Sequence, residues 1–343
     1  MLDPLRARAG RWSQVVAAVD DAMALLAVRE IGALDALRDG PLTAGELGAR
    51  LGVGPRRLRA FLDVAADLGF LGRQGASAAA TYSLDPRDEA LLDADADGAQ
   101  LLPTEDLRTL FSRRAQALDV LRTDVGLQVA SSGGAVSEGE RDGFLRYLDR
   151  HARAEASEVA ELLSDEPINR FADLGCGAGT YAHALLGRNP GATAVLVDRP
   201  NAGALVQEGL RRAGQAERAC FLGADLHEDT WVAAVGAPLD AVILSNVVHN
   251  HDPEACRGLL RRAATALRPG GRLLLKEFFM NDDGAGPPGA LRFALSMALM
   301  SPGGDLYTCP ELAGWLTEAG LDPGAPIRLL TAPESFVFVA TKT

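Results

Sequence analysis

The sequence contains few cysteines, almost no lysine and no excess of positive charge. Its 343 residues include 4 cysteines, none in CxxC spacing, and nearly all basic residues are arginine, with lysine at Lys276 and Lys342 alone. So few cysteines cannot cross-link a chain of this length, and we expect a reducing, cytoplasmic location without a disulfide framework or a zinc ribbon. The 34 Lys+Arg against 46 Asp+Glu give a formal net charge of −12. This charge disfavours nucleic acid and anionic membranes as partners, because phosphate binding needs positive charge at the contact.

Long apolar runs are also absent. No run reaches the ~20 residues that a membrane span needs, and the first residues lack the basic stretch and apolar core of a signal peptide. The composition is nevertheless 48% hydrophobic, which excludes a disordered chain. A chain of 343 residues is long enough to hold two domains.

The first 85 residues follow a helical pattern that ends in a hairpin. The segment Val15–Leu37 predicts one long helix with apolar residues on more than one face, which indicates a partner subunit. Thr43, followed three residues later by Glu46, forms a capping box that starts a second helix. A third helix over 56–68 and a small hairpin between 70 and 84 complete a winged-helix pattern.

The second half of the chain has a different rhythm. Residues 86–165 still read mostly as helix, with a Ser-Ser-Gly-Gly interruption at 131–134. Short apolar runs, typical of strands buried on both faces, then cover 171–174, 194–197, 219–222, 239–244 and 272–276. Because helix-length segments separate them, they predict an α/β fold with a doubly wound parallel sheet. Two last segments, 327–330 and 336–341, predict a C-terminal hairpin that gives this seven-stranded sheet an antiparallel edge.

The first of these strands leads into a glycine-rich loop. The loop reads Asp-Leu-Gly-Cys-Gly-Ala-Gly and contains Asp173, Gly175, Gly177 and Gly179. Its GxGxG spacing differs from the GxGxxG of dinucleotide-binding loops, and no Lys-Ser/Thr pair follows it as in a P-loop. Glycines allow a ligand to approach the backbone closely, and the acid before them suits a ligand that carries an amino group.

Two further acids follow the next two strands. Asp198 ends the second strand, where a carboxylate can bind ribose hydroxyls. Asp225 follows the third strand and can accept a hydrogen bond from an adenine amino group. Together with the glycine loop, these acids predict a nucleoside cofactor without phosphates.

The ordered set of motifs resembles a class I S-adenosylmethionine-dependent methyltransferase. The glycine loop, Asp198, the segments 223–226 and 245–256 and the C-terminal hairpin are similar to those of the small-molecule O-methyltransferases. This family is typified by the caffeate, isoflavone and hydroxyindole enzymes and by bacterial antibiotic-tailoring enzymes. The resemblance implies S-adenosyl-L-methionine as cofactor, S-adenosyl-L-homocysteine as product and a small-molecule acceptor in secondary metabolism. It also implies that Leu226 and Ser245 contribute to cofactor binding.

The resemblance divides the chain into three parts. Residues 1–85 would be a winged-helix dimerisation domain that forms a homodimer. Residues 86–165 would be a helical linker that contributes to the acceptor pocket, and residues 166–343 the cofactor-binding methyltransferase domain.

Methyl transfer to a phenol requires a base, because the phenol pKa lies near 10. Histidine suits this role since its pKa lies near neutrality, and His249, just after the fourth strand, matches the base of the resembled family. Glu277, 28 residues later, matches a family acid that orients the base. The chain departs from the family at Asn250 and His251, which replace an Asp and a Trp, and at Leu306, where the family has a second acid.

The resemblance places the wall of the acceptor pocket on the helix after the fifth strand. The expected pocket residues are Phe293, Met297 and Met300, together with Asn250 and with Phe144 and Leu148 on the helix before the methyltransferase domain. Methionine suits an adaptable apolar wall, although the same spacing is also consistent with ordinary core packing.

The acceptor atom stays open at this point. It can be oxygen, carbon, nitrogen or sulfur, and the enolate of an α-keto acid is the main carbon case. His249, His251 and Asp252 keep a metal that stabilises such an enolate under consideration. We expect no metal, because the chain has five histidines and none follows His251.

Two functions of other classes also stay open. The third helix carries Arg56, Arg57 and Arg59, a local basic face that would suit a DNA-binding regulator. The missing acid at Leu306 leaves room for a protein that binds S-adenosylmethionine without transferring its methyl group.

Overall fold

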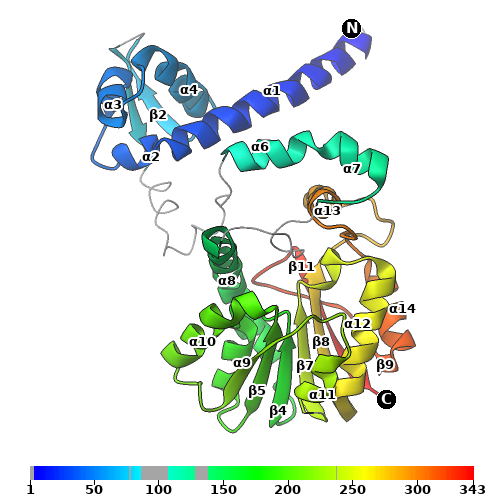
Figure 1. Ribbon diagram of the computed structural model, residues 1–343. Helices are drawn as coiled ribbons and strands as arrows, with labels where there is room; N and C mark the ends of the chain where they lie inside the picture. Colours follow the sequence, from blue (N-terminus) through cyan, green and yellow to red (C-terminus); the bar gives the residue numbers. More distant parts are fainter. Residues whose placement is uncertain (1–3, 77–78, 86–106, 128–137, 237) are drawn as a thin grey trace. The chain divides into compact units, whose positions relative to one another are not determined.

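The computed structural model describes residues 4–76, 79–85, 107–127, 138–236 and 238–343 (Figure 1). The chain forms two compact units, Met1–Ser112 and Arg113–Thr343. The division into three functional parts made from the sequence stays a prediction, and its interruption at 131–134 lies outside the described residues. Among the described residues, no helix is both long and apolar enough to cross a membrane.

The first unit combines helices with a three-stranded sheet. Its described elements are α1 (Pro4–Glu30), α2 (Ala33–Ala36), β1 (Leu42–Thr43), α3 (Ala44–Leu51), α4 (Pro55–Asp67), β2 (Leu71–Gln74) and β3 (Thr81–Leu84). The strands pair antiparallel in the order β1-β3-β2. The structure therefore contains the expected order of helix, helix and hairpin, and α6 (Leu107–Ala115) crosses into the second unit.

The start of the first unit differs from the sequence expectation at one glycine. The single helix expected over Val15–Leu37 is wrong, because the chain breaks into α1 and α2 at Gly32. Gly32 has a φ of 79°, a left-handed conformation that glycine adopts readily and that ends a helix. The capping box is confirmed: the Thr43 hydroxyl accepts from the Glu46 amide at 3.2 Å, and the Glu46 carboxylate accepts from the Thr43 amide at 2.7 Å.

The second unit alternates strands and helices. Its helices are α7 (Ala117–Thr123), α8 (Glu138–Glu161), α9 (Thr180–Arg188), α10 (Gly203–Arg212), α11 (Thr230–Ala234), α12 (Pro253–Ala266), α13 (Pro288–Met300) and α14 (Cys309–Glu318), with 3-10 turns η5 (Pro200–Ala202) and η6 (Val248–Asn250). Its strands are β4 (Arg170–Leu174), β5 (Thr193–Asp198), β6 (Ala219–Gly223), β7 (Leu239–Ser245), β8 (Leu267–Phe278), β9 (Leu321–Asp322), β10 (Ile327–Arg328) and β11 (Ser335–Lys342). The five parallel strands and the C-terminal hairpin of the sequence analysis are confirmed.

These strands form one mixed sheet in the order β10-β11-β8-β7-β4-β5-β6, with β9 added to β11. Strands β4 to β8 run parallel, and β11 is antiparallel to β8, β9 and β10. The short partner β9 extends the seven expected strands to eight. A short turn joins β10 to β11, so the two strands run antiparallel, because parallel strands would need a long crossover connection.

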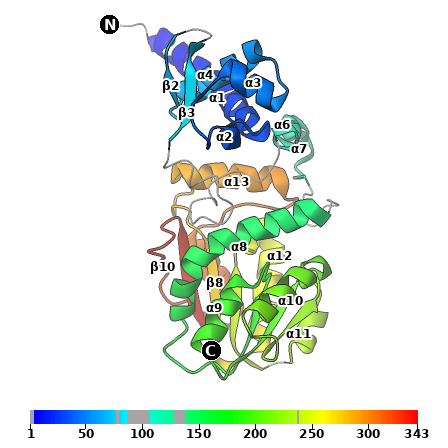
Figure 2. The same cartoon turned by 90° about the vertical axis from the view of Figure 1, so that its left-hand side faces the viewer.

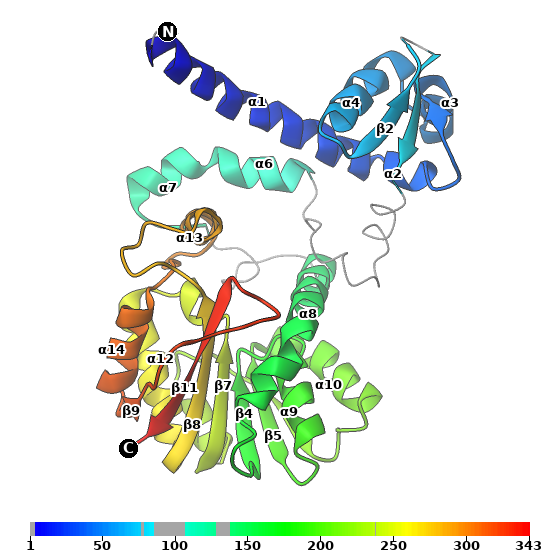
Figure 3. The same cartoon turned by 180° about the vertical axis from the view of Figure 1, so that it is seen from behind.

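Helices cover both faces of the sheet (Figures 1 and 3). On one face, α8, α9 and α10 pack on residues such as Phe171, Ile243 and Leu274. On the other face, α11, α12 and α14 pack on residues such as Leu174, Leu244 and Leu275. Since neighbouring residues of a strand point to opposite faces, the apolar runs read from the sequence serve both cores at once.

Helix α13 lies across the end of the sheet rather than on a face (Figure 2). It packs against the segment that follows β7, where the ring centroids of Phe293 and His249 are 5.2 Å apart. Its far end packs against α7 through Val120, Leu299 and Met300. The carboxyl ends of the parallel strands, where α/β proteins bind ligands, are therefore partly enclosed by α13.

We expect the two-sided core to dominate the stability of the second unit. Leu312 on α14 is fully buried, and Leu312→Ala should lower the free energy of unfolding by about 2–5 kcal/mol, as buried leucine truncations do. Leu330 is 88% exposed, so the matched change Leu330→Ala should stay within about 0.5 kcal/mol. Urea denaturation followed by tryptophan fluorescence measures both, and equal effects of the two changes would contradict this account of the core.

Candidate active site

The glycine loop is fixed against the end of β5. The amides of Gly175 and Cys176 both donate to the carbonyl oxygen of Val197, at 2.8 and 3.1 Å, and the amide of Gly177 donates to the Asp198 carboxylate at 2.7 Å. Gly175, Gly177 and Gly179 have φ values of 70°, 55° and 85°. Such values favour glycine, which explains why three of them stand here.

The loop leaves room for a ligand at its centre. A Cβ atom built on Gly177 would meet no atom within 4 Å, whereas one on Gly175 would lie 2.5 Å from Cγ2 of Val247. The loop therefore packs tightly on the segment after β7 and is open at Gly177. An open, glycine-lined backbone is what close approach of a cofactor requires.

Asp198 and Asp225 lie at the same edge of the sheet. Besides Gly177, the Asp198 carboxylate accepts from the Arg199 amide at 2.7 Å, and burial raises its pKa. The Asp198 carbonyl also accepts from the Ala224 amide at 2.9 Å, which ties β5 to the loop that carries Asp225. A carboxylate offers about four lone-pair sites, so Asp198 can still accept from ribose hydroxyls.

The Asp225 loop is held by its own backbone and by a tryptophan. The Asp225 carboxylate accepts from the His227 amide at 2.9 Å and is otherwise exposed. The carbonyl of Leu226 accepts from the indole N–H of buried Trp231 at 3.2 Å. This arrangement leaves the second carboxylate oxygen of Asp225 able to bind an amino group.

Two buried polar atoms at the ends of β4 and β7 make no hydrogen bond within the described part of the chain. They are Oδ2 of Asp173 and Oγ of Ser245, on residues that are 1% and 7% exposed. Burial raises the pKa of Asp173 to about 7, and the nearby Asp198 adds to the shift. Unsatisfied buried polar groups are costly, and an ammonium group would satisfy Asp173. These two oxygen atoms therefore fit the amino-acid end of S-adenosylmethionine, whose ammonium group is a hydrogen-bond donor.

His249 and Glu277 form a buried pair beside α13. Nδ1 of His249 lies 2.7 Å from Oε2 of Glu277, and Oε1 of Glu277 accepts from the Val248 amide at 3.0 Å. The two residues are 7% and 3% exposed. An ionised carboxylate can only accept, so the proton of the neutral imidazole is on Nδ1 and Nε2 carries the free lone pair. The structure thus brings together the expected base and the expected acid.

Aromatic side chains enclose this histidine. The ring centroid of His249 lies 5.2 Å from that of Phe293 and 5.9 Å from that of Phe278, and the two phenylalanines lie 4.3 Å apart. Phe278, Phe293 and Met297 pack in one apolar cluster with Met280 and Leu306. Among the described residues, the imidazole therefore contacts the Glu277 carboxylate through Nδ1 and has two aromatic rings beside it.

The other expected pocket residues are placed separately. Met300 packs with Val120 and Leu299 in a different cluster from Phe293 and Met297. Leu148 on α8 is exposed, and the side chain of Phe144 lies outside the described residues. The side-chain NH2 group of Asn250 donates to the Val247 carbonyl at 3.2 Å, and its side-chain oxygen lies 3.5 Å from the Ser301 hydroxyl.

His251 contacts a second histidine rather than an acid. Its Nδ1 lies 3.2 Å from Nε2 of His227, with the rings edge to face at 4.4 Å. Burial and the neighbouring His227, Arg199 and His249 lower the pKa of His251 to about 4, so the His251 ring is neutral near pH 7. Within the described residues, no group of three His, Cys, Asp or Glu side chains is placed to hold a metal ion.

Leu306, where the resembled family has its second acid, is 7% exposed and packs with Met280 and Ala290. The backbone amide of the preceding residue, Asp305, donates to the His249 carbonyl at 3.1 Å, and this hydrogen bond fixes the backbone of His249. Its own carboxylate is exposed and accepts from the Leu306 amide at 2.7 Å. Glu277 is thus the acid in contact with the His249 ring in the described structure.

The sequence analysis did not anticipate a buried network beside this pair. Lys276 is 1% exposed, and its ammonium group lies 2.6 Å from the Glu155 carboxylate of α8. Tyr181 of α9 donates to the same carboxylate. A lysine at the end of the apolar run 272–276 could have indicated this ion pair, since charged side chains are rarely buried unless they are paired.

A cavity of about 730 Å³ lies elsewhere on the second unit. It is lined by residues of α14, of β11 and of the segments that follow β8 and β9, among them Phe279, Asp282, Cys309 and Phe338. His249, Phe293, Met297 and Met300 are not among its lining residues.

Comparisons with known proteins give similarities that extend over most of the chain. A family model described as an O-methyltransferase domain matches residues 119–322. The chain is 29% identical over 312 residues to the tetracenomycin polyketide synthesis 8-O-methyl transferase TcmO of Streptomyces glaucescens, covering 90% of this chain and 89% of the relative. It is 28% identical over 325 residues to the 3-hydroxy-5-methyl-1-naphthoate 3-O-methyltransferase of Streptomyces sahachiroi, covering 93% and 91%. The structure of human N-acetylserotonin methyltransferase in complex with SAM is similar with a TM-score of 0.76 at 20% identity, over 99% of this chain and 98% of that one.

The pKa of Asp173 predicts how cofactor binding depends on pH. If the ionised Asp173 binds the ammonium group of S-adenosylhomocysteine, the protein must release a proton on binding below about pH 7. Affinity should then fall by roughly tenfold for each pH unit below that value. Calorimetry between pH 5.5 and 7.5 measures this slope. Asp173→Asn should bind more weakly and with a flat profile, and a flat profile for the unchanged protein would contradict the assignment.

Proposed function

Because the chain belongs to the O-methyltransferase domain family, we propose that its acceptor is a phenolic hydroxyl and that His249 removes the phenol proton. The enzyme is an S-adenosylmethionine-dependent methyltransferase that acts on a small-molecule acceptor. The observation that carries the proposal is the buried contact of 2.7 Å between Nδ1 of His249 and Glu277.

In proton removal, His249 accepts the proton and Glu277 stabilises the resulting charge. Nε2 takes the phenol proton, and the imidazolium that forms is stabilised by the Glu277 carboxylate at Nδ1. Because Glu277 also accepts from the Val248 amide, it fixes the turn and the ring together. When bound, S-adenosylmethionine supplies an electrophilic methyl group on its sulfonium.

We assign cofactor binding to the glycine loop and the acids around it. The open backbone at Gly177 and the unsatisfied Asp173 and Ser245 support binding of the amino-acid end. Asp198 would bind the ribose hydroxyls, and the Asp225–Leu226 loop the adenine. Each assignment rests on free acceptor capacity at the carboxyl edge of the sheet.

An aromatic acceptor suits the surroundings of the base. Phe278 and Phe293 flank His249, and Met297 belongs to the same apolar cluster. Aromatic rings pack well edge to face or offset against such side chains. One relative is named for a hydroxynaphthoate and another for a polyketide, so we propose a fused-ring phenol as the acceptor.

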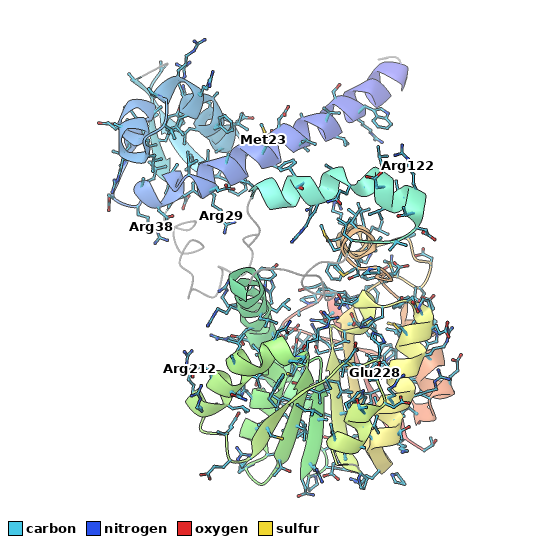
Figure 4. All side chains as sticks on the ribbon, viewed as in Figure 1. Met23, Arg29, Arg38, Arg122, Arg212 and Glu228 are labelled. Atoms are coloured by element: carbon cyan, nitrogen blue, oxygen red, sulfur yellow. The ribbon has the colours of Figure 1, made fainter. Side chains whose placement is uncertain are left out.

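We also propose that the enzyme is a cytoplasmic homodimer joined through its first unit, without nucleic acid or membrane partners. Helix α1 carries a row of exposed apolar side chains, including Trp12, Val15, Val16 and Val19, and Met23 of the same helix is labelled in Figure 4. Such a row supports association with another copy, because large exposed apolar surface is typical of interfaces. The net charge of −12 argues against phosphate-rich partners.

The base predicts a separation of turnover from cofactor affinity. His249→Ala should lower the turnover number by roughly 10²–10⁴-fold, the usual contribution of a positioned base. The dissociation constant of S-adenosylhomocysteine should stay unchanged, because His249 is assigned to the acceptor. A methyl-transfer assay with 3-hydroxy-5-methyl-1-naphthoate as trial acceptor, combined with calorimetry, measures both. Wild-type turnover in this variant would overturn the proposed role of His249.

Asp198 gives the opposite prediction. Asp198→Ala removes the acceptor of the Gly177 amide and the proposed ribose ligand, so it should weaken S-adenosylhomocysteine binding by at least about tenfold, the equivalent of one lost charged hydrogen bond. Calorimetry on the purified variant decides the matter, with His249→Ala as the control that retains affinity. Unchanged affinity would refute the ribose assignment.

A further inference from the structure

Strand β8 carries two consecutive charged residues that point to opposite faces of the sheet. Glu277 points to the face of α12 and α14, as its neighbour Leu275 does, and Lys276 points to the face of α8 and α9 with Leu274. Both side chains are buried, at 3% and 1% exposure. Glu277 holds the base, which leaves the role of Lys276 to be explained.

The Lys276 ammonium group contacts two residues from different elements. It lies 2.6 Å from the carboxylate of Glu155 on α8 and 3.3 Å from Oδ1 of Asn246, just after β7. Glu155 is 5% exposed and also accepts from the Tyr181 hydroxyl. Burying an ion pair costs desolvation energy, and an apolar pair of the same size is often no less stable. Stability alone therefore does not account for Lys276.

Asn246 is the first residue of the turn that leads to His249. Its φ is 56°, a left-handed conformation that asparagine tolerates better than most residues. Its amide donates to the Lys276 carbonyl at 2.9 Å, and its side-chain oxygen faces the Lys276 ammonium group. Lys276 thus holds Asn246 through both its main chain and its side chain.

The turn from Ser245 to His249 is consequently fixed at both ends by two adjacent residues of one strand. Lys276 holds Asn246 from one face of the sheet. Glu277 holds Val248 and His249 from the other. The register supports this arrangement, because Ser245 pairs directly with Lys276.

We infer that Lys276 is a positioning residue for the base: through Asn246 it sets the turn that carries His249, and Glu155 links that turn to α8. The inference rests on the proposed role of His249. The position of α8 is then coupled to the position of the imidazole. A displacement of a catalytic group by about 1 Å can cost roughly 10²-fold in rate, so such a support has a kinetic effect.

The test compares two substitutions at Asn246. Asn246→Gly retains the left-handed backbone, because glycine adopts positive φ freely, but it removes the oxygen that faces Lys276. Asn246→Asp retains an acceptor oxygen in that place and is the matched control. Both are made in the full-length protein, with S-adenosylhomocysteine as the probe of the cofactor site and 3-hydroxy-5-methyl-1-naphthoate as the trial acceptor.

We expect Asn246→Gly to broaden or shift the downfield NMR signal of the His249 Nδ1 proton, which is identified by its loss in His249→Gln. Turnover should fall by roughly 10- to 100-fold, and S-adenosylhomocysteine affinity should stay unchanged. Asn246→Asp should retain the signal and most of the turnover. A wild-type signal in Asn246→Gly would overturn the inference. If the unchanged protein failed to bind S-adenosylhomocysteine, the proposed function would fail instead, while the NMR comparison, which needs no cofactor, would still decide the positioning role.

A second comparison tests Lys276 itself. Lys276→Met alone leaves Glu155 buried without its cation and is expected to unfold readily, whereas Glu155→Gln combined with Lys276→Met removes both charges and should fold. Because the double variant lacks the ammonium group that faces Asn246, it should show the same change of the His249 signal as Asn246→Gly. Retention of the wild-type signal in a folded double variant would overturn the positioning role of Lys276.

Discussion

The contact between His249 and Glu277 is the interaction on which the proposed chemistry of this protein depends. It requires a buried glutamate near the end of β8. Its burial is tolerated because each carboxylate oxygen has a polar partner: one contacts the His249 ring and the other accepts a hydrogen bond from the Val248 amide. The partner histidine arrives on the turn after the adjacent parallel strand. The pairing of β7 with β8 therefore sets the geometry of the base, and the helices on both faces keep that pairing in place.

The cofactor side of the site follows from the same sheet. Asp173 and Asp198 lie at the carboxyl ends of two neighbouring parallel strands and Asp225 on the loop after the next one, so three carboxyl groups lie at one edge of the sheet. Burial raises the pKa of Asp173 and of Asp198. Such an edge gathers hydrogen-bond acceptors and therefore suits a ligand that brings positive charge and hydrogen-bond donors. The excess of acidic residues in the composition thus has a local counterpart, although most of it lies on the surface.

Local patterns in the sequence predicted much of this, and long-range contacts account for what they missed. The strands, the glycine loop and the capping box at Thr43 depend on neighbouring residues, and the structure has them where they were expected. The helix break at Gly32 was missed because a single glycine is often tolerated within a helix. The ion pair of Lys276 with Glu155 joins residues 121 positions apart, and the separation of Met300 from Met297 depends on α7. No periodicity within one segment reports contacts of that kind.

The missing second acid at Leu306 is best understood through the same balance of burial and charge. Leu306 lies in an apolar cluster with Met280 and Ala290, where a carboxylate would be desolvated without a donor to bind it. Glu277 meanwhile uses both of its oxygens and needs no second acceptor to fix the Nδ1 proton of His249. The aromatic wall around the imidazole then serves a further purpose, because low polarity strengthens the attraction between the imidazolium and the one carboxylate that remains. One buried acid in apolar surroundings can therefore orient the base that a pair of acids would orient in a wetter site.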